Sequence, residues 1–256
     1  MVHLQLSVVV LAALLRGATP ASHRLPTAGG PCLAAKPFCH ASGLDVISYP
    51  NDFAGYSRLG GPPSSYYITQ NLKPLQRGHT NATVFPENTD PPPSFQRVFP
   101  RPDIPDGYYV IGWTRETNGN VVVDANNYTV VYEGFYRAPT TGKYTFCASA
   151  DNETDFFFGH DNAFSCLTGH ADPAAKPVMM STGGDLTLPN GVIRNDMNCT
   201  DLNLVQGGFY PVRNVMGNWH GPSGFNLTIQ KPGESFEQRK NVFDGDVYPR
   251  SCGFFF

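Results

Sequence analysis

The chain has 256 residues, which is enough for one sizeable hydrophobic core, and a single all-β domain can reach this length. Its formal net charge is −3 and it holds no run of lysine or arginine. Nucleic acid is therefore not expected as a partner, because phosphate binding needs concentrated positive charge. Charged residues make up only 15% of the chain, whereas glycine (26) and proline (23) are abundant, a composition that favours many strands joined by turns.

Residues 1–21 have the pattern of a secretory signal peptide. A mostly apolar run from Leu4 to Leu15 precedes small residues that end at Ala21, where we expect cleavage. Only His3 precedes the run, so the usual positive segment is missing. The run is shorter than the about 20 residues that span a bilayer, and no later segment is apolar enough to do so. We therefore predict a secreted or cell-surface protein without membrane insertion.

The cysteines and glycosylation sequons agree with an extracellular location. An even number of cysteines behind a secretory signal predicts disulfides, although the sequence does not select the pairing. Zinc is the competing interpretation, but no C-x-x-C and no close Cys/His ladder supports it. The six cysteines are Cys32, Cys39, Cys147, Cys166, Cys199 and Cys252, and the N-x-S/T sequons begin at Asn81, Asn127, Asn152, Asn198 and Asn226.

Residues 22–105 are expected to be a loop-rich N-terminal part of the same domain as the rest of the chain. Proline and glycine recur throughout this region, and both residues break helices and central strands. No helical stripe of useful length is present. The region is expected to be pinned by Cys32 and Cys39, and disorder is the alternative for residues 85–105 because of their composition.

Residues 106–256 have the texture of a β-sandwich core. Tyr144, Phe146 and Ala148 alternate with polar or small residues, which is the period of a half-buried strand. Turn signals separate such runs at residues 125–127 and 139–142. Trp113 is expected to lie in a strand and in the core. With many strands and no convincing helix, the sequence predicts an all-β, antiparallel β-sandwich.

The polar pair Asp151-Asn152 lies between two segments that are expected to be apolar strands. This pair follows the alternating strand and precedes Phe156, Phe157 and Phe158, which we expect in the core. A β-turn is the simple interpretation, since both residue types favour turns. An EF-hand is excluded because Phe156 occupies the position that needs glycine. Asp155 and Asp161 are expected to be turn and surface acids, although Asp155 is also a candidate to support the pair from behind.

Two stretches of the sequence resemble a known family. The first is YEGFYRAPTTGKYTFCASADNETDFFFGHDNAFSC (residues 132–166), and the second is GGFYPVRNVMGNWHGPSGFNLTIQKPG (residues 207–233). Together they resemble the protective-antigen-type sandwich of fungal cell-wall adhesins, in particular its GLEYA branch, of which the flocculins are relatives. The likeness is close over these blocks and extends more loosely from about residue 40 to residue 250.

The resemblance implies a calcium-dependent lectin site built from two loops. In the family, the first loop carries two adjacent acids joined by a cis peptide, and these correspond here to Asp151 and Asn152. The second loop supplies an Asn side chain and two backbone carbonyls, which correspond to Asn218, His220 and Pro222. Carboxylates, amide oxygens and carbonyls are all ligands that Ca²⁺ accepts. The expected cofactor is therefore Ca²⁺.

This chain departs from the family pattern at Asn152, where an amide replaces the second acid. The change removes one negative charge and is expected to weaken calcium binding. Asn152 also begins a sequon, and a glycan there would block the site, so we expect this residue to be unmodified. Trp219 is either a stacking surface for a sugar ring or a residue that packs beneath the loop, and the sequence does not decide between these roles.

The resemblance thus implies a lectin that recognises terminal sugars of glycans or cell-wall polysaccharide, with a hexose or N-acetylhexosamine as the expected terminus. We expect a monomer without catalytic activity. Two alternatives remain. A glycan-active enzyme would need two carboxylates facing each other across a cleft, and no second acid stands out. The second alternative is a structural cell-wall module that no longer binds calcium.

Overall fold

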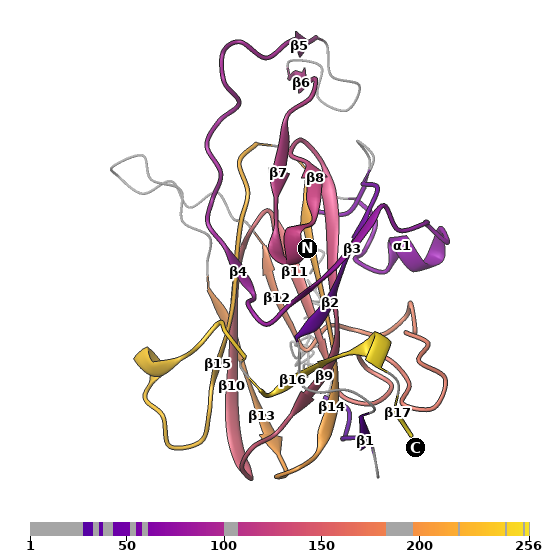
Figure 1. The fold of residues 1–256 in the computed structure, drawn as a ribbon, viewed down its shortest axis with the longest axis vertical. Coiled ribbons are helices and arrows are strands. Elements are labelled where there is room, and N and C mark those ends of the chain that lie inside the picture. The colour runs from indigo at the N-terminus through magenta and orange to yellow at the C-terminus, as the bar shows by residue number, and fades with distance from the viewer. Residues whose placement is uncertain are drawn as a thin grey trace, which may run out of the picture.

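The computed structural model describes residues 28–32, 36–37, 43–51, 55–57, 61–99, 107–182, 197–219, 221–243, 245–252 and 254–255. The expected signal peptide, Cys39 and His220 lie outside the described residues. The described chain is almost entirely β-structure, and all of its strand pairs are antiparallel, which confirms the predicted fold class (Figure 1).

Two sheets form the body of the molecule. The larger is seven-stranded, in the order β12 (Met179–Thr182), β11 (Glu153–Phe158), β14 (Phe209–Asn218), β9 (Tyr128–Arg137), β2 (Leu44–Tyr49) and β3 (Gln76–Thr80), with β16 (Val247–Pro249) also paired to β9. The smaller is four-stranded, in the order β13 (Asn198–Leu204), β10 (Gly142–Asp151), β15 (Gly224–Gln230) and β4 (Val84–Phe85).

Short elements complete the fold. Three two-stranded pairs are formed by β1 (Lys36–Pro37) with β17 (Phe254–Phe255), β5 (Arg97–Val98) with β6 (Tyr109–Val110), and β7 (Thr114–Glu116) with β8 (Val122–Asp124). The helical turns are α1 (Tyr66–Thr69), η1 (Asn118–Asn120), η2 (Phe236–Gln238) and η3 (Arg250–Cys252). Figure 1 shows that β5 and β6 lie beyond one end of the two sheets.

The main hydrophobic core lies between the two sheets. Tyr144, Phe146 and Ala148 of β10 point inward, as their alternation predicts. Phe146 contacts Phe156 and Phe158 of β11, with ring centroids 5.2 and 5.0 Å apart. The expectation that the three phenylalanines of β11 are core residues is confirmed, since each is at most 1% exposed.

A second apolar cluster covers the other face of the seven-stranded sheet. Phe157 points into it, on the opposite side of β11 from its two neighbours, and joins Val131, Phe135 and Val215. Tyr56 and Tyr67, from the loop before α1 and from α1 itself, lie over this face. Strands β9, β11 and β14 are therefore buried on both faces along almost their whole length.

The N-terminal region contributes more to the fold than its sequence indicates. We expected residues 22–105 to be loops, yet Leu44–Tyr49 forms β2, which lies inside the seven-stranded sheet between β9 and β3. Asp45 and Ser48 interrupt its apolar pattern, and both are buried by neighbouring segments. Trp113 is buried as expected, but it precedes β7 instead of lying within a strand.

Disulfides tie distant segments together. Cys32 pairs with Cys166, 134 residues later, which anchors the N-terminal segment to the loop after β11. Cys147 pairs with Cys199, and Cys252 is also disulfide-bonded. No described cysteine is free, which agrees with the predicted disulfide framework.

Candidate functional site

The pair Asp151-Asn152 lies where the chain passes from one sheet to the other. Asp151 is the last residue of β10 in the four-stranded sheet, and Glu153 is the first residue of β11 in the seven-stranded sheet. The peptide bond between Asp151 and Asn152 is cis, as expected. Both residues are partly exposed, so their side chains are accessible at this end of the sandwich.

The second predicted loop meets this pair. The Asn152 backbone N–H donates to the Gly217 carbonyl at 3.3 Å, and the Trp219 N–H donates to Asn152 Oδ1 at 2.8 Å. The register that pairs Glu153 with Gly217 brings the end of β14 alongside the start of β11. Residues more than 60 positions apart in the sequence therefore meet here, through the two neighbours of Asn218 in the chain.

Asn218 is fully buried at the end of β14. Its Nδ2 donates to the Ala125 carbonyl at 3.0 Å and to the Gly221 carbonyl at 3.3 Å. Its Oδ1 has no hydrogen-bond partner among the described residues. An unsatisfied buried acceptor costs about 1–3 kcal/mol. This oxygen is thus available to a cation, and a cation would relieve the cost.

The side chains of the first loop contact each other. Asn152 Nδ2 donates to Asp151 Oδ1 at 3.0 Å, while Asn152 Oδ1 accepts the hydrogen bond from the second loop. An amide oxygen has two lone pairs, so Asn152 Oδ1 keeps one for another partner. The donor set consists of one carboxylate and two amide oxygens, which are hard ligands of the type that Ca²⁺ prefers.

The remaining predicted residues are placed less centrally. Trp219 is partly buried, and its role as a stacking surface stays a prediction. Pro222 is partly exposed and lines a cavity of about 130 Å³ together with Gly221, Trp113 and Tyr108. In the described part of the chain, no group of three or more His, Cys, Asp or Glu side chains is arranged to hold a metal, so any ion here would depend on neutral oxygens in addition to the Asp151 carboxylate.

Arg115 holds the second loop in place, and the sequence did not indicate it. Its guanidinium donates to Ser223 Oγ at 2.9 Å and to Asn88 Oδ1 at 2.9 Å, and it also contacts the Ser223 carbonyl. Asn88 Oδ1 accepts the Ser223 N–H at 2.7 Å, and the Tyr128 hydroxyl lies 2.8 Å from Ser223 Oγ. Arg115 is only 8% exposed and lies over the Phe85 ring. Segments from three parts of the chain thus hold Ser223, which follows the predicted loop ligands.

We predict that Arg115→Met loosens residues 221–223 and weakens ligand binding at the adjacent loops by about tenfold or more, because hydrogen bonds to a charged group contribute about 1.5–3 kcal/mol. Arg77→Met, at an exposed position of β3, is the matched control. Isothermal titration calorimetry measures both variants. Equal affinities in the two variants would show that the contacts of Arg115 do not shape the site.

Two acids behind the pair titrate near neutral pH. Burial, and then the charge of Asp155, raises the pKa of Glu153 to about 7. Burial raises the pKa of Asp155 to about 6, although a hydrogen bond from Ser64 and the charge of Arg213 oppose the rise. The expectation that Asp155 is a surface acid is wrong, because Tyr56 and its loop cover this face of β11 and leave Asp155 only 6% exposed.

The raised pKa of Asp155 predicts a pH-dependent stability. The folded protein holds the Asp155 proton more tightly than the unfolded chain does. The contribution of Asp155 to the free energy of unfolding is therefore complete below about pH 4 and is lost as pH rises through about 6. Asp155→Asn is expected to remove this decline, which amounts to about 2–3 kcal/mol. Urea denaturation from pH 4 to 8, in the presence of a calcium chelator, measures the free energy of unfolding at each pH. Asp201→Asn is the contrast, because a hydrogen bond from Thr145 lowers the pKa of Asp201. An unchanged pH slope in Asp155→Asn would contradict the prediction.

The antiparallel strands and the two main sheets define the class of protein: an all-β sandwich domain. Residues 128–231 match the GLEYA domain family, which confirms the resemblance over this part of the chain. No curated protein matches the chain. In the described residues, no helix has the length and apolar character needed to cross a membrane.

Two similar solved structures come from Candida glabrata. The A domain of epithelial adhesin 9, in complex with Galβ1-3GlcNAc, is 18% identical with a TM-score of 0.61, and the alignment covers 88% of this chain and 96% of that chain. The A domain of epithelial adhesin 6, also with Galβ1-3GlcNAc, is 18% identical with a TM-score of 0.57 and coverage of 88% and 92%. At this identity the likeness shows a shared fold.

Proposed function

We propose that this protein is a calcium-dependent lectin of an extracellular or cell-surface fungal adhesin, and that it binds a terminal sugar at the meeting point of its two loops. The observation that carries the proposal is Asn218 Oδ1, a buried oxygen without a partner among the described residues, one residue before Trp219, whose N–H donates to Asn152. The disulfides agree with an extracellular location.

The residues fit Ca²⁺ by their chemistry. Asp151, Asn152 and Asn218 would hold the ion through side-chain oxygens, and the carbonyls of His220 and Pro222 are the expected backbone ligands. A bound Ca²⁺ would supply open coordination positions for two neighbouring hydroxyls of a sugar. Asp151 is the one carboxylate in this set, so we expect weaker calcium affinity than a site with two acids would have.

The protein groups around the ion orient the sugar. The partly exposed Asp151 carboxylate accepts hydrogen bonds from sugar hydroxyls, and Asn152 Nδ2, now bonded to Asp151, becomes a donor to the sugar when that bond opens. Arg115 keeps the carbonyl-bearing loop rigid through Ser223. A rigid loop reduces the entropy cost of binding. Trp219 adds an aromatic surface for a sugar ring.

A hexose terminus is the proposed ligand, with β-galactose first among hexoses. Structures of the same fold hold Galβ1-3GlcNAc, Galβ1-4GlcNAc and β-lactose, all of which end in β-galactose. Binding by a single site is expected to be weak, and display of many copies compensates through multivalency. We propose a monomeric domain without catalytic residues; turnover of a glycan by the purified protein would favour the enzyme alternative instead.

A glycan array with and without calcium tests the proposal. We expect galactose-terminated glycans to bind in calcium, to be released by chelator and to bind again when calcium is restored. Asp161→Ala, which removes an exposed acid from a turn outside the site, controls for a general loss of charge. Glycan binding that does not change when chelator is added would refute the proposed calcium site. An array on which no glycan binds would refute the proposed lectin function.

A further inference from the structure

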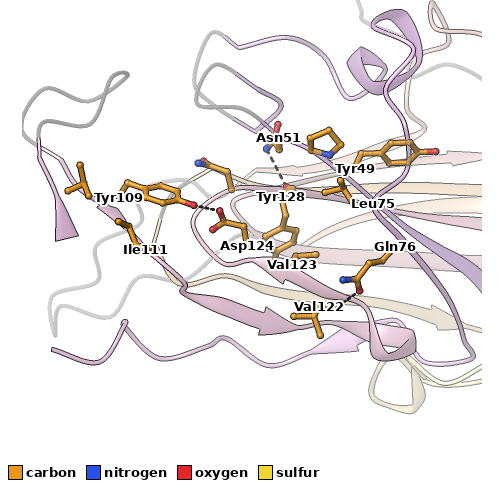
Figure 2. A pocket seen from close by; sticks show the side chains of 13 residues that line it. Tyr49, Asn51, Leu75, Gln76, Tyr109, Ile111, Val122, Val123, Asp124 and Tyr128 are labelled. Carbon is orange, nitrogen blue, oxygen red and sulfur yellow. Dashed lines mark hydrogen bonds between the residues drawn. The ribbon is translucent and has the colours of Figure 1, made fainter. Parts of the chain in front are cut away.

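An apolar groove of about 820 Å³ lies at the same end of the sandwich as the two loops, beside strand β9 (Figure 2). Its walls come from the ends of β2 and β3, from the β5–β6 pair, and from β8 and the start of β9. Four of its side chains are large, apolar and strongly exposed: Leu75 (66%), Ile111 (47%), Val122 (42%) and Val98 (40%). Clustered exposure of this kind marks a surface that is covered in the working protein.

The groove carries almost no charge. Asp124 is the one ionisable acid among its lining residues, and it is hydrogen-bonded to the Tyr109 hydroxyl (Figure 2). No lysine or arginine is among the described residues that line it. Gln76 is also occupied, since its Oε1 accepts the Val122 N–H at 2.9 Å. The surface therefore fits a neutral ligand with apolar faces and hydroxyl groups.

Asn127 is one of the residues that line this groove. It begins the sequon Asn127-Tyr128-Thr129 and lies in the turn between β8 and β9, where it is partly exposed. Asn81, Asn198 and Asn226 are more exposed but lie outside the groove lining, as does Asn152. A glycan acceptor in a surface turn is normal for a secreted protein. Among these sequons, only Asn127 lies at an apolar surface that the described residues leave exposed.

We propose that Asn127 carries an N-linked glycan whose first sugar residues lie in the groove and cover it. The inference rests on the extracellular route proposed above. In the transfer step, Asn127 Nδ2 bonds to the anomeric carbon of a lipid-diphosphate-linked oligosaccharide. The lipid diphosphate departs, and the amide nitrogen loses one proton. Thr129 is fully buried in the fold, so the transfer occurs on the chain before β9 is incorporated into the sheet.

The attachment point decides the occupant. A sugar bonded to Asn127 is held at the groove at a high local concentration without a separate binding event. Its C–H faces pack on Leu75, Ile111 and Val122, while its hydroxyls reach water and the polar atoms of Asp124. The volume is within the about 300–1,000 Å³ of ordinary ligand sites, so one or two sugar residues fit.

The experiment uses the full chain secreted from a eukaryotic host. Peptide mass spectrometry measures the occupancy of each sequon, and we expect Asn127 to be occupied. An endoglycosidase that leaves the first N-acetylglucosamine is compared with an amidase that removes the whole glycan. We expect fluorescence of the apolar dye bis-ANS to rise and Tm to fall by about 2–4 °C only after complete removal. Asn127→Gln is expected to match the fully deglycosylated protein, and Asn198→Gln is the control.

Two results would overturn the inference: an unmodified Asn127 beside other occupied sequons, or complete removal that changes neither dye binding nor Tm. If Asn127→Gln fails to fold, the enzymatic comparison on folded protein still decides. A chain without any glycan would overturn the extracellular route together with this inference. Loss of calcium-dependent sugar binding in the array would refute the proposed lectin and leave the occupancy of Asn127 as a separate result.

Discussion

Asp151→Ala is expected to reduce calcium-dependent sugar binding by about 100-fold or more while the sandwich stays folded. Asp151 supplies the one carboxylate of the proposed calcium set, so its removal leaves only neutral oxygens to balance a divalent ion. It is also partly exposed at the end of β10 and belongs to neither hydrophobic cluster, so little packing is lost. Calorimetric titration with calcium and a galactoside measures the affinity, and thermal unfolding checks the fold.

Asp151→Asn separates charge from geometry. The amide keeps the size of the side chain and one of its oxygens but removes the negative charge, so we expect calcium affinity to fall nearly as far as in the alanine variant. Asp161→Ala is the matched control, since this acid lies in an exposed turn outside the site. Retention of wild-type calcium affinity by both Asp151 variants would rule out the proposed ion site.

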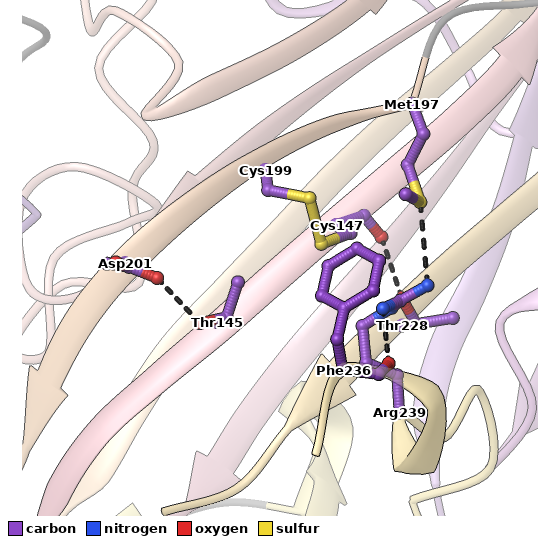
Figure 3. Close-up of a disulfide and its surroundings, with 8 residues drawn as sticks. All are labelled: Thr145, Cys147, Met197, Cys199, Asp201, Thr228, Phe236 and Arg239. Atoms are coloured by element: carbon purple, nitrogen blue, oxygen red, sulfur yellow. Dashed lines mark hydrogen bonds between the residues drawn. A yellow bond between two sulfur atoms is a disulfide. The ribbon is translucent and has the colours of Figure 1, made fainter.

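Replacing both Cys147 and Cys199 with alanine is expected to lower the free energy of unfolding by about 4 kcal/mol. The bond closes a segment with a sequence separation of 52 residues, and the chain-entropy relation for a loop of this length leads to that value. Figure 3 shows the bond between neighbouring strands β10 and β13, where the two cysteines are directly opposite in the register. Denaturant unfolding, with a linear extrapolation to water, measures the loss.

The surroundings of this disulfide allow a sharper comparison. Thr145 donates to Asp201 at 2.6 Å on the same strand pair, but Asp201 is exposed and Thr145 is partly exposed (Figure 3). Thr145→Ala is therefore expected to cost less than about 1 kcal/mol. A double cysteine variant that loses no more than Thr145→Ala would show that β13 is held by its backbone pairing and not by the covalent link.

The sequence by itself determined the local structure of the core. Alternation over Tyr144, Phe146 and Ala148 predicted a strand with one buried face, and the structure has it as β10. The apolar run at Phe156–Phe158 and the turn at residues 125–127 also agree with the structure. These features depend on neighbouring residues, whose spacing along the chain already states which face of a strand is buried. The family motif added the positions of the two loops.

Only the tertiary structure decided how distant segments meet. The place of β2 inside the large sheet, the burial of Asp155 and the contact of Arg115 with Ser223 depend on pairings across many residues. The same holds for the pairing of Cys32 with Cys166. Such contacts are selected by the packing of whole sheets and not by local periodicity, because each one is weak until the others form. The juxtaposition of Asn218 with Asn152 is of this kind, and so is the proposed sugar site.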